Sequence, residues 1–199
     1  MEADAIEWIT LCVAVCLVGY VGLRLMRIKD RVQDRPSVRY EDLEFKTGDL
    51  VLFHTNVWLM FLLDSPFSHV GMVVVHDGVP YVYEIVPEHG TPTLTAVNRR
   101  TMVGAFYRSI DLPLENVGEA ILRQKTTYDF STWEPLLHEA FASLFWPRLP
   151  RRRKSSSMSC AMLIGALVQQ YGIMVGKSHF VPEDFSTHVG RWGRERRVV

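Results

Sequence analysis

The chain has 199 residues, is 48% hydrophobic and carries 22 basic and 22 acidic residues, so its formal net charge is zero. This length suits one domain with an appendage, and the apolar fraction predicts a protein that forms a core. The composition excludes wholesale disorder and a generally basic surface, so we expect no nucleic-acid partner.

The first apolar run, from Trp8 to Leu23, contains no charged residue. As a helix it spans about 24 Å, and Ile6, Leu25 and a snorkelling Arg24 extend it toward the roughly 30 Å of a bilayer core. Acidic residues precede the run and basic residues follow it, unlike in a cleavable signal peptide. The pattern predicts an uncleaved single-pass membrane helix with the rest of the chain on the cytosolic side. The alternative is a buried helix of the domain.

Composition also divides the chain into segments. We expect an acidic cap with the membrane helix and its basic flank, a charged linker, a domain that contains an inserted helix and basic loop, and a solvated basic tail. Their bounds are residues 1–31, 32–45, 46–190 with the insertion at 133–157, and 191–199.

The first half of the domain contains mainly strand patterns. Residues 48–55 predict a strand after a glycine turn, and the continuous apolar run 57–64 predicts a short buried helix. Residues 70–75 and 79–86 flank Asp77-Gly78, a strong signal for a two-residue hairpin turn. Extended chain is expected near residues 93–97 and 104–110.

The second half contains helical patterns, over residues 113–125, 133–146 and 159–172, the last ended by Gly172. Strands in the middle with helices on either side predict an α+β fold. The apolar face of residues 133–146 either lies on a membrane surface or packs on the domain. The first alternative would place Arg151, Arg152, Arg153 and Lys154 on anionic lipid. We favour packing, because apolar helical faces usually belong to a core.

The hairpin predicts that one histidine lies near one carboxylate. If Asp77 and Gly78 are the only turn residues, Gly71 faces Glu84, and His69 lies two positions away on the same face. His69 and Glu84 are then diagonal neighbours with Cα atoms about 7–8 Å apart. A three-residue loop would instead place Glu84 on the opposite face.

Cys160 is the only cysteine outside the apolar N-terminal run, so the domain can form no internal disulfide, which fits a reducing compartment. It begins a predicted helix, with Ser159 as the expected cap. A helix start lowers a thiol pKa and a histidine completes the activation. The alternative is a small buried apolar residue. Because no histidine shows metal-ligand spacing with the cysteines, we expect no metal and no cofactor.

Five segments in this order carry a resemblance: "GDLVLFHT", "SPFSHVGMVVV", "YVYEIVP", "YDF" and "SCAMLIGALVQQYG". Together with the late "VPEDF", they resemble the circularly permuted papain-like thiol hydrolases of the NlpC superfamily, over roughly residues 46–187. In that group the histidine strand precedes the cysteine helix, as it does here. The resemblance implies a small antiparallel sheet or half-barrel packed on the cysteine helix.

The resemblance also implies roles for individual residues. Cys160 would be the nucleophile, His69 the general base and Glu84 the orienting residue, with Tyr128 and Ser159 near the substrate. Members act on peptide amides and on lipid acyl chains, so either is the expected substrate. This chain departs from the group in its wholly apolar "CAML", which suggests a greasier substrate, and in the long segment before Cys160.

Two functions follow from these patterns. The first is a membrane-anchored cysteine-dependent hydrolase or acyl-transfer enzyme, which the agreement of all three chemical positions favours. The second is a catalytically inactive membrane-associated structural protein, for example of a virion, that keeps the papain-like shell. The membrane would be a host membrane or a virion membrane.

Overall fold

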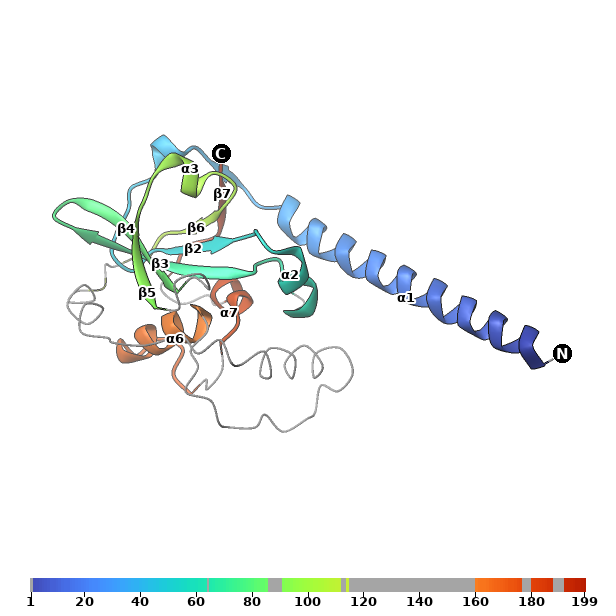
Figure 1. Ribbon diagram of the computed structural model, residues 1–199. Coiled ribbons are helices and arrows are strands. Elements are labelled where there is room, and N and C mark those ends of the chain that lie inside the picture. Colours follow the sequence, from blue (N-terminus) through green and yellow to red (C-terminus); the bar gives the residue numbers. More distant parts are fainter. Residues whose placement is uncertain are drawn as a thin grey trace.

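The computed structural model describes residues 2–63, 65–85, 91–111, 114, 160–176, 180–187 and 192–199. These residues form an α+β structure, with a mixed seven-stranded sheet, helices beside it and a long N-terminal helix that extends away from it (Figure 1). The expected α+β class with one apolar N-terminal helix is confirmed at this level.

The sheet has the strand order β1-β7-β6-β2-β3-β4-β5. All neighbouring strands are antiparallel except β1 and β7, which are parallel. The strands are β1 (Ser37–Val38), β2 (Leu50–Phe53), β3 (His69–His76), β4 (Val79–Ile85), β5 (Pro92–Ala96), β6 (Phe106–Arg108) and β7 (Arg196–Val198). The helical segments are α1 (Glu2–Gln33), η1 (Tyr40–Asp42), α2 (Val57–Leu63), α3 (Arg99–Met102), α6 (Cys160–Gln170) and α7 (Pro182–Thr187).

The hairpin of β3 and β4 has the predicted two-residue turn. Asp77 and Gly78 both have positive φ angles, 51° and 77°, as a type I′ turn requires. The register runs from His76 opposite Val79 to Met72 opposite Tyr83. The sequence prediction of this register is therefore confirmed, and Glu84 lies on the face of the hairpin that also carries His69.

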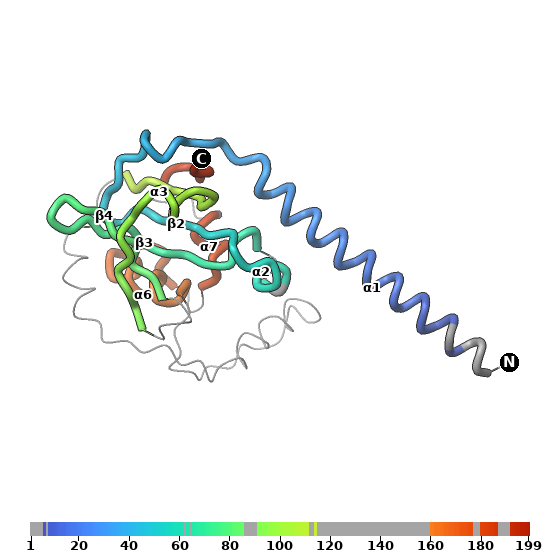
Figure 2. Tube along the Cα trace, turned by 45° about the horizontal axis from the view of Figure 1, so that its top comes forward, coloured from blue at the N-terminus to red at the C-terminus, as the bar shows by residue number. Residues whose placement is uncertain are grey.

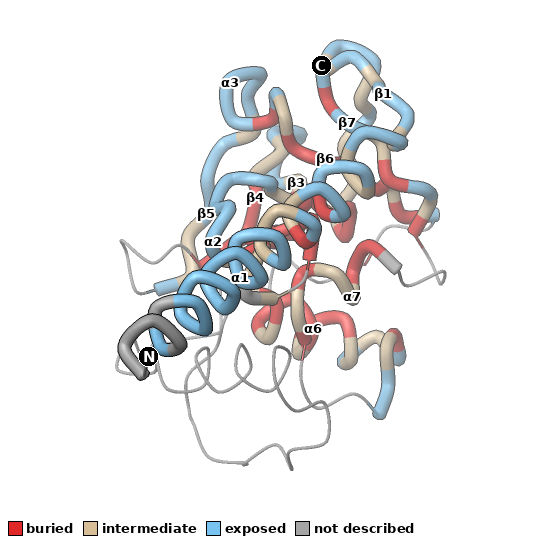
Figure 3. Tube along the Cα trace, turned by 90° about the vertical axis from the view of Figure 1, so that its right-hand side faces the viewer, coloured by how far each residue is buried: buried red, intermediate tan, exposed pale blue. Residues whose placement is uncertain are grey.

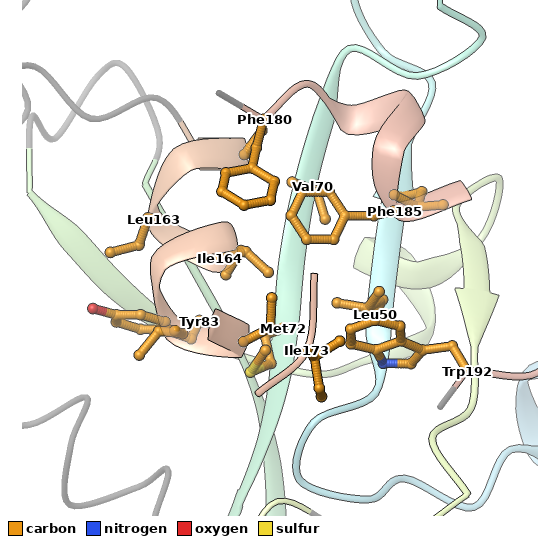
Figure 4. Packing of buried hydrophobic residues seen from close by; sticks show 14 of the residues in the cluster. Leu50, Val70, Met72, Tyr83, Leu163, Ile164, Ile173, Phe180, Phe185 and Trp192 are labelled. Atoms are coloured by element: carbon orange, nitrogen blue, oxygen red, sulfur yellow. The ribbon is translucent and has the colours of Figure 1, made fainter. Parts of the chain in front are cut away.

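Apolar side chains pack on both faces of the sheet. On one face, α6 lies against β3 and β4, and its Leu163 and Ile164 pack with Met72 and Tyr83 (Figure 4). Gly165 makes close packing possible there, because a Cβ atom at this position would lie 2.1 Å from Phe180. A second cluster, on the other face, contains Val51, Val73, Val82, Met102, Ala105, Tyr107 and Val198.

Helix α1 is longer than the predicted run. It contains a segment, Trp8–Gln33, that is long and apolar enough to cross a membrane by its length and composition. The helix is exposed along most of its length (Figure 3). Arg24 and Ile28, in its C-terminal third, are buried. The exposed part is therefore the part suited to lipid.

Two predictions about the chain ends are wrong. Ser37 and Val38, within the predicted linker 32–45, pair with Arg197 and Val198, within the predicted solvated tail 191–199. The sheet thus extends beyond residues 46–190 at both ends. Composition could not reveal this, because two short basic segments form strands here only by pairing with each other and with β6.

The predicted helix 57–64 is present as α2, but it is not wholly buried, since Trp58 is 73% exposed. The predicted helices 113–125 and 133–146 lie outside the described residues, apart from Leu114, and so does the basic loop at Arg151–Lys154.

Candidate active site

His69 and Glu84 meet where β3 begins. His69 is the first residue of β3, and its Nε2 lies 2.7 Å from Oε2 of Glu84 on β4. Gly71 stands across from Glu84, where a Cβ atom would come within 3.5 Å of the Glu84 Cβ and 2.4 Å of Val82 Cγ1. The missing side chain at Gly71 therefore leaves room for the diagonal contact that the hairpin predicted.

Cys160 reaches this pair from α6, of which it is the first residue. Its sulfur interacts with the His69 ring and with the backbone N–H groups of Val70 and Ala161. Because Nε2 of His69 faces Glu84, Nδ1 is the ring nitrogen left for the sulfur. The three side chains thus form one chain of contacts from thiol to imidazole to carboxylate.

Burial alone would raise the pKa of the Cys160 thiol. The charge of the His69 imidazolium and its hydrogen bond outweigh burial, and the N–H groups of Val70 and Ala161 act in the same direction, so the pKa of Cys160 is lowered. A lowered thiol pKa increases the thiolate fraction near neutral pH, and the thiolate is the nucleophilic form.

The imidazole responds in the opposite sense. Burial favours the neutral ring, but the Cys160 thiolate and then Glu84 favour the charged ring, and the pKa of His69 is raised to about 10. Each of the two groups therefore favours the charged form of the other, a thiolate beside an imidazolium. The His69 and Glu84 side chains are 17% and 11% exposed, and Cys160 is half-buried.

Residues on neighbouring segments hold His69 in place. The Phe53 ring, opposite His69 in the β2–β3 register, has its centroid 5.3 Å from that of the imidazole. The Ser68 N–H donates to the Phe53 carbonyl, and Ser68 Oγ accepts from the N–H groups of Thr55 and Asn56. Sequence analysis missed Phe53, because the long connection between β2 and β3 leaves their register open.

The structure thus brings together Cys160, His69 and Glu84, the three residues predicted to carry chemistry. Tyr128 and Ser159, predicted near the substrate, lie outside the described residues. Within the described part of the chain, no group of three or more His, Cys, Asp or Glu side chains is arranged to hold a metal ion.

Comparisons with known proteins leave the family open. No family model matches the chain, and no curated protein matches it. Among solved structures, the chain is similar to the metalloprotein yiiX from Escherichia coli O157:H7, at 18% sequence identity and a TM-score of 0.47, over 68% of this chain and 71% of that chain. A similarity of this degree assigns neither a family nor an activity to this chain.

Proposed function

We propose that the protein is a membrane-anchored, cysteine-dependent hydrolase or acyl-transfer enzyme of the permuted papain-like type. The observation that carries the proposal is the contact between the Cys160 sulfur and the His69 ring, which Glu84 orients from the other side. The chain order supports it as well, because the histidine strand β3 precedes the cysteine helix α6, as in the permuted group that the sequence resembles.

The reaction begins with the Cys160 thiolate. The sulfur attacks the carbonyl carbon of an amide or ester, a C–S bond forms, and the carbonyl π electrons move onto oxygen. As the tetrahedral intermediate collapses, the bond to the leaving nitrogen or oxygen breaks, and the His69 imidazolium donates its proton to that atom. Water or another acceptor, deprotonated by neutral His69, then attacks the thioester and releases the acyl group.

The other contacts have supporting roles. Glu84 accepts a hydrogen bond from Nε2–H of His69, so it selects the tautomer whose Nδ1 faces the sulfur and stabilises the charged ring. The N–H groups of Val70 and Ala161 stabilise the thiolate before attack. The substrate is a peptide amide or a lipid acyl group, and the basic flank of α1 favours a domain on the cytosolic side.

Covalent labelling by an activated acyl ester tests the proposal. The full-length protein in detergent micelles should become acylated, C160S should not, and H69Q should react much more slowly. The double variant C12S/C16S is the matched control, because it removes the two exposed thiols of α1 and leaves Cys160. We expect its labelling to equal that of the unmodified chain.

Two outcomes would contradict the proposal. Labelling that persists in C160S would show that another group reacts. Labelling of Cys160 that does not depend on His69 would show ordinary thiol reactivity, and the inactive structural protein would then be the better interpretation.

A further inference from the structure

Helix α2 is an apolar element that the described part of the domain covers on one side only. All seven of its residues are apolar, yet Val57 and Trp58 are exposed while Met60 is buried in the domain. A tryptophan at 73% exposure on an uncharged helix is costly in water. Tryptophan is enriched at the boundary between lipid and water, where its ring contacts apolar chains and its N–H remains solvated.

The position of α2 beside α1 indicates what covers it. Most of the exposed apolar residues of α1 lie between Ile6 and Leu23, and Met26 follows beyond the buried Arg24. The Arg24 guanidinium lies over the ring of Phe61 in α2, 5.0 Å from its centroid, and donates to Tyr20 Oη. Arg24 is the first charged residue after the apolar run, so its level on α1 corresponds to the membrane surface.

Two views agree that α2 is the described part of the domain that reaches furthest along α1 toward its N-terminus (Figures 1 and 2). Helix α2 contacts α1, and its Phe61 ring lies against Arg24, so the apolar residues of the two helices adjoin where the uncharged run of α1 ends. This arrangement favours lipid as the occupant over a second copy of the chain.

We infer that α2 is a second membrane contact, which lies in the lipid interface with Val57 and Trp58 and so fixes the orientation of the domain on the bilayer. The inference requires that α1 spans the membrane, but it does not require that Cys160 is a nucleophile.

The contact extends to the candidate active site through a short, hydrogen-bonded connection. Asn56 Oδ1 accepts from the N–H groups of Trp58 and Leu59 and so caps α2, while the Ser65 N–H donates to the Met60 carbonyl. Ser68, directly before His69, accepts from the Asn56 N–H. A lipid-bound α2 would therefore hold the beginning of β3, with His69, near the bilayer surface.

Site-specific fluorescence on the full-length protein in phosphatidylcholine nanodiscs tests this inference. In a background that carries C12A, C16A and C160A, the W58C variant is labelled with an environment-sensitive NBD group. The exposed position removes no core contact, so the variant should fold. We expect blue-shifted emission, protection from an aqueous quencher, and quenching by lipids with a nitroxide near the headgroup.

Two other label positions serve as controls. V103C, 51% exposed at the end of α3 and distant from the N-terminal part of α1, should remain accessible to the aqueous quencher. A chain that keeps only Cys16 reports independently whether α1 enters the bilayer.

The possible results separate the alternatives. The inference would be overturned if the label at position 58 were as accessible to water as the label at position 103 while Cys16 lay inside the bilayer. That result would leave the membrane anchor and the enzyme proposal intact. Protection without quenching by nitroxide lipid would show that protein covers α2, which also overturns it. A water-accessible Cys16 would overturn both this inference and the membrane anchor, but not the proposed chemistry.

Discussion

The domain contains two groups of buried polar and charged side chains that are stabilised in different ways. One is the His69–Glu84 pair with Cys160, at the beginning of β3. The other, which we term the terminal clamp, consists of Arg35, Arg108, Ser186 and Glu195. In the clamp, Glu195 accepts from Arg35 and Ser186, and Arg108 donates to the carbonyls of Phe185, Ser186, Trp192 and Gly193.

The difference between the two groups is chemical. The clamp uses its donors to hold the backbone of α7 and the C-terminal segment, and it contains no thiol. Burial lowers the pKa of Arg108, the Glu195 charge opposes this effect, and the Arg35 charge adds to it. The guanidinium nevertheless remains charged, because its pKa is so far above neutral pH. In the first group, the charged His69 imidazole instead stabilises the Cys160 thiolate. A buried pair of opposite charges therefore produces a reactive sulfur in this group.

Replacement of His69 should give the largest effect on chemistry. H69A removes both the cation that lowers the Cys160 pKa and the proton donor, so we expect acylation to slow by about 10²–10⁴-fold. The thiol pKa, followed by the pH dependence of iodoacetamide alkylation, should rise, because burial is then opposed only by the backbone N–H groups. If H69A left both the acylation rate and the Cys160 pKa unchanged, the active-site group would be no more reactive than the clamp.

Replacement of Arg108 should give the largest effect on stability. R108M leaves the clamp carbonyls without their donor and Glu195 with less compensation, so we expect a loss of about 3–5 kcal/mol in the free energy of unfolding. Denaturant titration of the full chain in detergent measures it. The acylation rate per folded molecule should not change, and a selective loss of acylation at full stability would mean that the clamp takes part in the chemistry.

An added methyl group at Gly71 should perturb the active-site group through packing. G71A places a Cβ atom 2.4 Å from Val82 Cγ1 and beside Glu84, so we expect about 1–3 kcal/mol of destabilisation and slower acylation. G193A is the matched control beside the clamp, where Ser109, at 3.3 Å or more, is the one described residue that the new Cβ would meet. Equal losses of stability in the two variants would contradict the crowding at Gly71.

Neutralisation of Glu84 should give the smallest effect. Acylation should rise with pH as Cys160 ionises and fall again as His69 loses its proton, near pH 10. Glu84 raises the His69 pKa by less than Cys160 does. E84Q should therefore shift the fall in acylation at high pH to a lower pH by about one unit. The pH profile of acylation measures it. A fall that stays at the same pH would show that Glu84 orients the ring without stabilising its charge.

Several features of the site are local enough to follow from sequence. Asp77-Gly78 predicts a two-residue turn, and that turn alone determines the register that places Glu84 diagonal to His69. The start of α6 at Cys160 and its end at Gln170, two residues before Gly172 with its φ of 72°, follow from helix-start and helix-stop signals. The apolar run of α1 likewise identifies a helix suited to a membrane.

Other features depend on contacts between distant parts of the chain. β1 and β7 form only because the two ends of the chain meet, and Phe53 reaches His69 only because β2 pairs with β3 in one register. The exposure of α2 depends on which of its sides the domain covers, which an unbroken apolar run cannot indicate.

The sequence by itself therefore determined the hairpin, the helix that begins with the thiol and the apolar N-terminal helix, because backbone preferences and side-chain periodicity act over a few residues. Only the tertiary structure decided that the Cys160 sulfur contacts the His69 ring and that Val57 and Trp58 of α2 are exposed beside α1. Those contacts result from the packing of α6 on β3 and of α2 on α1, between segments that are far apart in the chain.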